Sequence, residues 1–189
     1  MAINNIKQFN YLILMFISLF LFTNNLYAQV KDELSRIDRI LSETGKIIRY
    51  NDYYLPGIKG TYGMGKLEMK VRVVNTGSSQ NNNFVVLSRE TKYSKAIGSI
   101  SEDELIEILD ALATLSEIVV TETNTANYTE NKYISKDGFQ IGYYLNKKGK
   151  AQWFVTLEKY ASGKTFFLKN SEDIKEGFLA AQNKLKEFQ

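Results

Sequence analysis

Two short acidic motifs are the first candidates for chemistry in this sequence. The tripeptide Ser-Glu-Asp occurs at residues 101–103 and again at residues 171–173, each time after a short apolar segment. Paired carboxylates can bind a metal ion or act as a general acid and a general base. The same tripeptide is also typical of a helix start, where the serine caps the helix and the carboxylates lie near its positive end. We favour capping, because the motif occurs at the same point in both halves.

The absence of two residue types excludes much other chemistry. The chain contains no histidine and no cysteine. Zinc and copper sites, Ser–His and Cys–His nucleophile pairs, and disulfides are therefore excluded. The glycines at positions 57, 60, 63 and 65 resemble a phosphate-binding loop, but we expect a strand after them, whereas such a loop leads into a helix. We predict no catalytic residue, no metal site and no cofactor.

Aromatic and basic residues define a candidate ligand face. Lys66, Lys70 and Arg72 lie on the polar side of an alternating segment at residues 66–74. Tyr144 and Phe154 fall opposite the apolar sides of their own segments, so the two rings meet on an open sheet face if these segments pair. Aromatic platforms bind sugars, bases and peptides, and similar rings also pack beneath a loop, a helix or a second subunit.

Apolar periodicity predicts the elements that position these residues, in a β-β-β-β-α order that occurs twice. In the first copy we expect strands at residues 46–55, 66–74, 84–89 and 95–100, a glycine-rich connection at 56–65, and a helix that Ser101 caps with Glu104. In the second copy we expect strands at residues 128–134, 139–145, 151–159 and 164–168, and a helix that begins at residue 170 or 171. An amphipathic helix at residues 30–41 precedes both copies.

We therefore predict an α+β fold made of two ββββα repeats, with antiparallel sheets and with the helices packed on one face. The expected organisation is a signal peptide at 1–28, an N-terminal helix at 29–45, a first unit at 46–120 and a second unit at 121–189, with both units in one compact domain.

The first residues are typical of an export signal. Lys7 precedes an apolar stretch at residues 11–22, and a polar segment then ends at Ala28, after which we expect cleavage. The apolar stretch is shorter than the roughly 20 residues that a membrane span needs. We therefore predict an exported protein, periplasmic or secreted, with no membrane span after cleavage.

Two resemblances concern the style and the topology of the chain. The short signal that ends Leu-Tyr-Ala-Gln, with a body rich in Asn, Lys and Ile, resembles small secreted proteins of Bacteroidetes that lack assigned functions. The doubled ββββα order over residues 46–188 is similar to the Whirly and PUR-alpha groups, and that resemblance implies binding of single-stranded nucleic acid. Neither resemblance assigns a role to any residue here.

Charge argues against a nucleic-acid partner. The whole chain has a formal net charge of +3, and residues 1–29 hold one lysine and no acidic residue, which leaves +2. We expect a non-enzymatic envelope protein that acts as a binding or interaction module, with a protein or a glycan as partner or with a homodimer as an alternative. The competing hypotheses are a single-stranded nucleic-acid-binding protein and a carboxylate-based glycan hydrolase.

Overall fold

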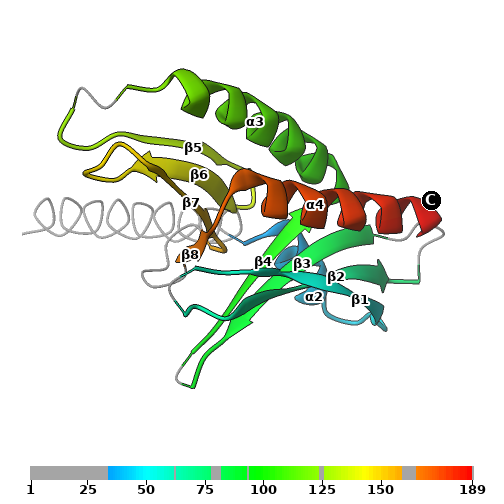
Figure 1. The fold of residues 1–189 in the computed structure, drawn as a ribbon. Helices are drawn as coiled ribbons and strands as arrows, with labels where there is room; N and C mark the ends of the chain where they lie inside the picture. Colours follow the sequence, from blue (N-terminus) through cyan, green and yellow to red (C-terminus); the bar gives the residue numbers. More distant parts are fainter. Residues whose placement is uncertain are drawn as a thin grey trace, which may run out of the picture.

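The chain folds into two four-stranded antiparallel sheets, each followed by a long helix (Figure 1). The structure is a computed structural model that describes residues 34–61, 63–77, 82–92, 94–123, 126–158 and 165–188. The predicted α+β fold with two ββββα units is confirmed. The signal peptide predicted at residues 1–28 and the start of the strand predicted at residue 164 lie outside the described residues.

Each sheet is a simple meander in which neighbouring strands follow one another along the chain. The first unit consists of β1 (Arg49–Lys59), β2 (Lys66–Asn75), β3 (Asn82–Glu90), β4 (Lys95–Ser101) and α3 (Glu102–Thr121). The second unit consists of β5 (Glu130–Ile134), β6 (Gln140–Leu145), β7 (Ala151–Thr156), β8 (Thr165–Leu168) and α4 (Ser171–Leu185), and a short 3-10 helix, η1 (Lys186–Phe188), follows. No helix in the described part of the chain is both long enough and apolar enough to cross a membrane.

The two long helices pack side by side on the same side of both sheets (Figure 1). Helix α4 lies mainly against β1, β2 and β3 of the first sheet, although it belongs to the second unit. Helix α3 belongs to the first unit, and it contacts β5 and β6 of the second sheet as well as β3 and β4. The core between helices and sheets is therefore shared by the two units.

Both long helices bury one apolar face. Leu105, Ile108 and Leu112 of α3 are buried, whereas Leu109 is only partly buried. In α4 the buried residues are Ile174, Phe178, Ala181 and Leu185. Burial of such stripes supplies most of the stability of helices in proteins.

The helix starts of the two units are offset by one residue. Ser101 is the N-cap of α3 and forms the predicted capping box with Glu104. In the second unit Asn170 is the N-cap, and its side chain accepts a hydrogen bond of 2.8 Å from the Asp173 backbone N–H. The Ser-Glu-Asp tripeptide therefore occupies positions one residue later in the second helix, which corrects the expectation of equivalent placement.

Strand β1 extends further than the sequence indicates. It begins at Arg49 and runs through Pro56 and Gly57 to Lys59, with a register shift against β2 between Leu55 and Ile58. We expected a loop from residue 56, but an edge strand tolerates proline and a bulge, because one side of it has no neighbouring strand.

Glycine residues allow the two sheets to join closely. Gly60 forms an isolated bridge with Leu168 of β8, and the Thr61 N–H donates a 2.9 Å hydrogen bond to the Phe167 carbonyl. A Cβ atom at Gly60 would lie 2.5 Å from the Phe166 ring. The glycine-rich segment therefore docks against the second sheet.

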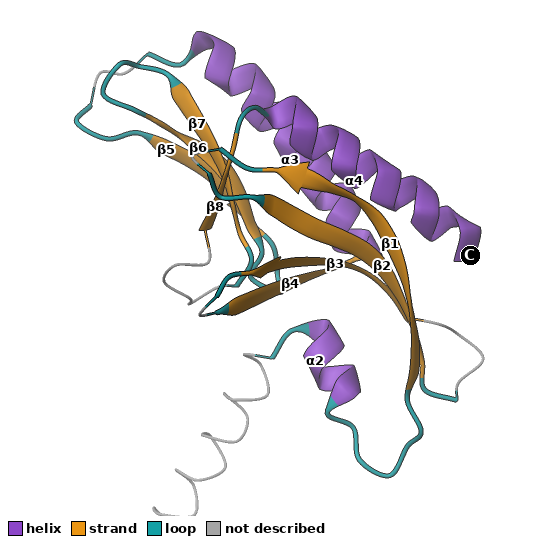
Figure 2. Cartoon of the chain, turned by 60° about the horizontal axis from the view of Figure 1, so that its bottom comes forward, coloured by secondary structure: helices purple, strands orange, loops and turns teal. Residues whose placement is uncertain are grey.

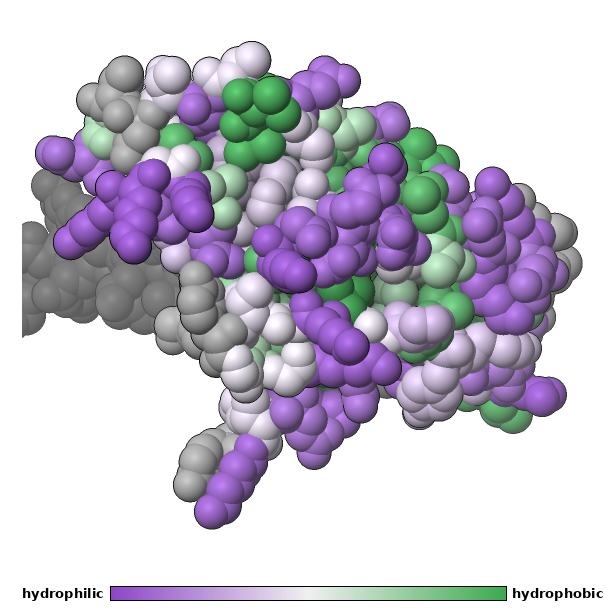
Figure 3. All heavy atoms as spheres, in the orientation of Figure 1, coloured by the Kyte–Doolittle hydropathy of each residue, from purple (hydrophilic) through white to green (hydrophobic). Residues whose placement is uncertain are grey.

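A short helix, α2 (Arg36–Leu41), covers part of the opposite face of the first sheet (Figure 2). Its Ile37 is buried against Val74, Phe84 and Val86 in a second, smaller core. The helix predicted at residues 30–41 begins at Arg36 in the structure, because Ser35 is extended and caps it; residues 30–33 lie outside the described residues. Helices therefore contact the first sheet on both of its faces. The outer surface in the view of Figure 1 is mostly hydrophilic, with separate hydrophobic patches (Figure 3).

Candidate functional site

The predicted ligand-face residues lie on two different sheets. Lys66, Lys70 and Arg72 belong to β2 of the first sheet, whereas Tyr144 lies on β6 and Phe154 on β7 of the second. The structure brings Tyr144 and Phe154 together in one hollow. It does not place the three basic residues in that hollow.

The basic residues of β2 are bound to an acidic partner on β1. Asp52 lies opposite Arg72 in the sheet register. It accepts hydrogen bonds of 2.7 and 2.8 Å from the Arg72 guanidinium and one of 2.7 Å from the Lys70 ammonium. The hydrogen bonds from Arg72 are the main reason that the pKa of Asp52 falls to about 2. Asp52 is therefore ionised at neutral pH and neutralises part of the positive charge.

Two tyrosine rings on β1 complete this cluster. The Arg72 guanidinium lies 4.2 Å from the Tyr50 ring centroid, and the Lys70 ammonium lies 5.5 Å from that of Tyr54. Such cation–π contacts hold both cations in place. Lys66 is exposed and takes no part in the cluster. The arrangement uses Lys70 and Arg72 for contacts within the sheet and leaves little positive charge for an external anion.

The acidic motif of the first unit likewise forms contacts within the fold. Asp103 accepts hydrogen bonds of 2.7 and 3.1 Å from the Arg36 guanidinium of α2, and this lowers its pKa. Glu104 is fully buried and accepts hydrogen bonds from the backbone N–H of Ser101 at 3.2 Å and of Asp137 at 2.9 Å. These carboxylates link α2, α3 and the β5–β6 turn. Their contacts support capping and cross-linking as the role of the motif.

The strongest candidate site is a hollow of about 340 Å³ on the face of the second sheet opposite α3 and α4. We call it the second-sheet hollow. Its lining residues are Tyr128, Glu130, Lys132, Gln140, Tyr144, Phe154, Thr156, Thr165 and Phe167. Volumes of this order are found in sites for small ligands.

Four of the lining residues are aromatic. The Tyr144 ring lies between Tyr128, which it meets in a stacked arrangement with centroids 6.1 Å apart, and Phe167, which it meets edge to face, also at 6.1 Å. Phe154 is only 6% exposed and lies opposite Gly142 in the register. A Cβ atom at Gly142 would clash with the Asn131 carbonyl oxygen, so the glycine allows β5 to approach β6 closely next to the Phe154 ring.

Polar groups lie beside these rings. The Tyr128 hydroxyl donates a hydrogen bond to the Glu130 carboxylate. This hydrogen bond is the main reason that the pKa of Tyr128 rises to about 12. Glu130 also pairs with the Lys132 ammonium at 2.8 Å. The Thr156 and Thr165 hydroxyl oxygens are 3.0 Å apart. The hollow thus combines apolar ring surfaces with neutral and paired charged groups, as in sites for amphipathic ligands.

Sequence reasoning identified two of the lining residues and missed the others. Tyr128, Glu130 and Lys132 alternate along the segment that leads into β5, and this alternation was available as a signal. The positions of Gln140, Thr156 and Phe167 depend on which strands pair and in what register.

Comparison of the chain with protein-family models, curated proteins and solved structures found no match. Across the residues that the structure describes, no group of three or more acidic side chains is arranged to hold a metal ion.

Proposed function

We propose that this protein is an exported, non-enzymatic binding module that recognises a glycan in the second-sheet hollow. The observation that carries the proposal is the set of rings from Tyr128, Tyr144 and Phe167 around a hollow that also contains amide, hydroxyl and ammonium groups. A sugar ring has apolar C–H faces and a polar rim of hydroxyl groups. The aromatic rings can pack against the C–H faces of the sugar. Gln140, Lys132 and the two threonines can form hydrogen bonds with its hydroxyl groups.

The charge of the hollow supports binding rather than hydrolysis. Glycoside hydrolysis ordinarily requires two carboxyl groups on either side of the scissile bond. Among the described lining residues Glu130 is the one carboxylate, and its oxygens already accept contacts from Tyr128 and Lys132.

A glycan fits the charge distribution better than a nucleic acid does. Binding of a nucleic-acid backbone depends on basic side chains that can neutralise phosphates. In this chain Lys70 and Arg72 contact Asp52, and Lys132 contacts Glu130. An exported binder of neutral sugars needs no such charge.

The experiment is a screen of the mature chain, residues 29–189, on a glycan array, followed by titration calorimetry with the best glycan. We expect Tyr144→Ala to reduce the affinity by about tenfold or more, since burial of one large side chain contributes roughly 1.5–3 kcal/mol. Tyr54→Ala is the matched control, because Tyr54 is an exposed tyrosine on the first sheet. Equal loss of affinity in both variants, or no glycan bound, would refute the proposal.

Export is tested separately. The mature protein should begin at Gln29, and mass spectrometry of the periplasmic and secreted fractions identifies that terminus. A full-length chain that stays in the membrane would contradict cleavage after Ala28.

A further inference from the structure

The edge of the first sheet provides a second surface with the properties of a peptide-binding site. Strand β1 is 11 residues long and pairs with β2 on one side. No described strand pairs with its other side. Long open edges of this kind can accept an added strand from another chain.

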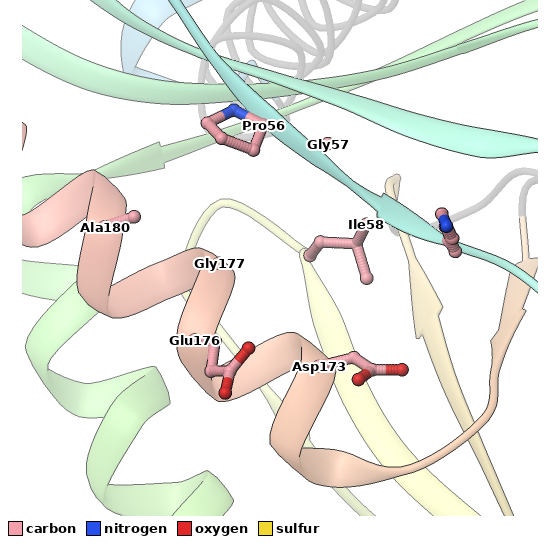
Figure 4. A pocket seen from close by; sticks show the side chains of 8 residues that line it. Pro56, Gly57, Ile58, Asp173, Glu176, Gly177 and Ala180 are labelled. Carbon is pink, nitrogen blue, oxygen red and sulfur yellow. The ribbon is translucent and has the colours of Figure 1, made fainter.

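A groove lies between this edge strand and α4, and we call it the β1–α4 groove (Figure 4). It has a volume of about 390 Å³. Its lining residues are Pro56, Gly57, Ile58 and Lys59 from β1 and Asp173, Glu176, Gly177 and Ala180 from α4. A groove between an edge strand and a helix is the setting in which several peptide-binding domains add a strand.

Small residues on α4 let the helix approach β1 closely and leave space for a ligand above the contact. Gly177 packs so closely on Ile58 that a Cβ atom there would lie 3.0 Å from the isoleucine side chain. Ala180, one turn further along α4, presents only a methyl group. The floor of the groove is therefore apolar and shallow, and suits the aliphatic stem of a long side chain.

The charge of the groove favours a basic occupant. Asp173 and Glu176 lie on the helical wall, and neither forms an ion pair with a described residue. By contrast, the neighbouring Glu172 pairs with Lys175. Lys59 is the one cation among the lining residues, so the groove has excess negative charge.

We propose that the β1–α4 groove binds an extended, basic peptide segment of a partner protein by strand addition. The peptide backbone pairs with β1 along residues 49–55. Pro56 has no N–H and ends that pairing at the bulge. The next lysine or arginine of the peptide enters the groove, with its stem against Ile58 and its charge between Asp173 and Glu176.

A selection with random linear peptides tests this proposal directly. The mature chain is immobilised, and ten-residue peptides displayed on phage are enriched on it at moderate salt. We expect the selected peptides to share a lysine or arginine next to alternating β-branched or aromatic residues. Enrichment of peptides without a basic residue, or of none at all, would overturn the proposal.

Matched variants then locate the binding of one selected synthetic peptide. Asp173→Asn combined with Glu176→Gln should weaken its binding about tenfold in fluorescence polarisation, and added salt should reduce the difference. Ala180→Leu should also weaken it by filling the groove. Glu172→Gln, on the same helix but paired outside the groove, should leave the affinity within about twofold.

Two further results would contradict the mechanism. N-methylation of alternate backbone nitrogens in the selected peptide should abolish binding, because it removes the donors that pair with β1; unchanged binding would exclude strand addition. Dimerisation of the protein through β1, seen as a doubled mass that Ala180→Leu abolishes, would identify a second copy as the occupant and would overturn the proposal. The glycan tests are unaffected, since Tyr144 lies on the other sheet.

Discussion

Replacement of Glu104 by alanine should destabilise the whole fold far more than loss of an ordinary helix carboxylate does. Glu104 is 0% exposed. One carboxylate oxygen accepts the Ser101 backbone N–H at 3.2 Å and the Ser101 hydroxyl at 3.0 Å, and the other accepts the Asp137 N–H at 2.9 Å. Alanine would leave all three donors without this partner.

The expected magnitude follows from those donors. A buried donor left without a partner costs about 1–3 kcal/mol. Ser101 is only 3% exposed, so water cannot easily hydrogen-bond to its N–H and hydroxyl groups in the variant. Asp137 is half-buried, and water can reach its N–H more easily. Relief of the buried charge offsets part of the loss. We therefore expect a loss of about 2–4 kcal/mol in the free energy of unfolding, or a fall of roughly 4–16 °C in Tm for a chain of this size.

Urea unfolding provides the assay. The single tryptophan, Trp153, is 5% exposed and lies 5.1 Å from the Tyr143 ring, so its fluorescence reports on the second sheet. Circular dichroism reports on both units. Coincident transitions would show that damage at Glu104 in the first unit is felt across the molecule.

Two variants keep the test interpretable. Glu104→Gln keeps the size of the side chain and one acceptor oxygen, and it should cost about 1–2 kcal/mol. Glu117→Ala makes the same chemical change at an exposed position of α3 and should stay within about 0.5 kcal/mol of wild type. If Glu104→Ala is no more harmful than Glu117→Ala, the hydrogen bonds assigned to Glu104 do not stabilise the fold.

Three other predictions concern charge, metals and the two units. The pKa of Asp52 is lowered to about 2 in the folded protein, so its stabilising effect is complete above the unfolded pKa of about 4 and disappears as the pH falls toward 2; acid titration of stability should be shallower in Asp52→Asn, and an unchanged slope would contradict the ion pairs. Thermal stability should not change with EDTA, and a drop of several degrees in Tm would reveal a metal site. Fragments 29–121 and 122–189 should each be poorly folded alone and should regain native fluorescence when mixed, whereas a stable monomeric fragment would show that the units are independent.

Local features of the fold were predictable from the sequence because their signals are local. Alternation along β2 identifies its two faces, and the Ser101–Glu104 spacing identifies the start of α3. Pro56 and Gly57 misled us for the same reason. Their local preference is for a turn, but pairing with β2 and the bulge hold them within β1.

The candidate site was less predictable because it depends on register. The neutralisation of Arg72 requires Asp52 directly opposite it, and the aromatic lining of the hollow requires Phe167 directly opposite Phe154. These neighbours come from separate strands, and a shift of one residue would send the side chains to the other face. The sequence indicated that Tyr144 and Phe154 share a face, but it did not identify Tyr128 and Phe167 as their neighbours.

The position of α4 has a consequence for how the chain reaches its folded state. Helix α4, which covers β1, β2 and β3, follows all of the described strands along the chain, so it is synthesised after the sheet that it covers. Until Phe178 and Leu185 are in place, the apolar side of β1 and β2, which α3 does not cover, stays open to solvent and to other chains. Chaperones that hold the emerging chain would therefore act mainly on its first half, and a chain that stops before residue 171 would be a substrate for proteolysis rather than a smaller version of the protein.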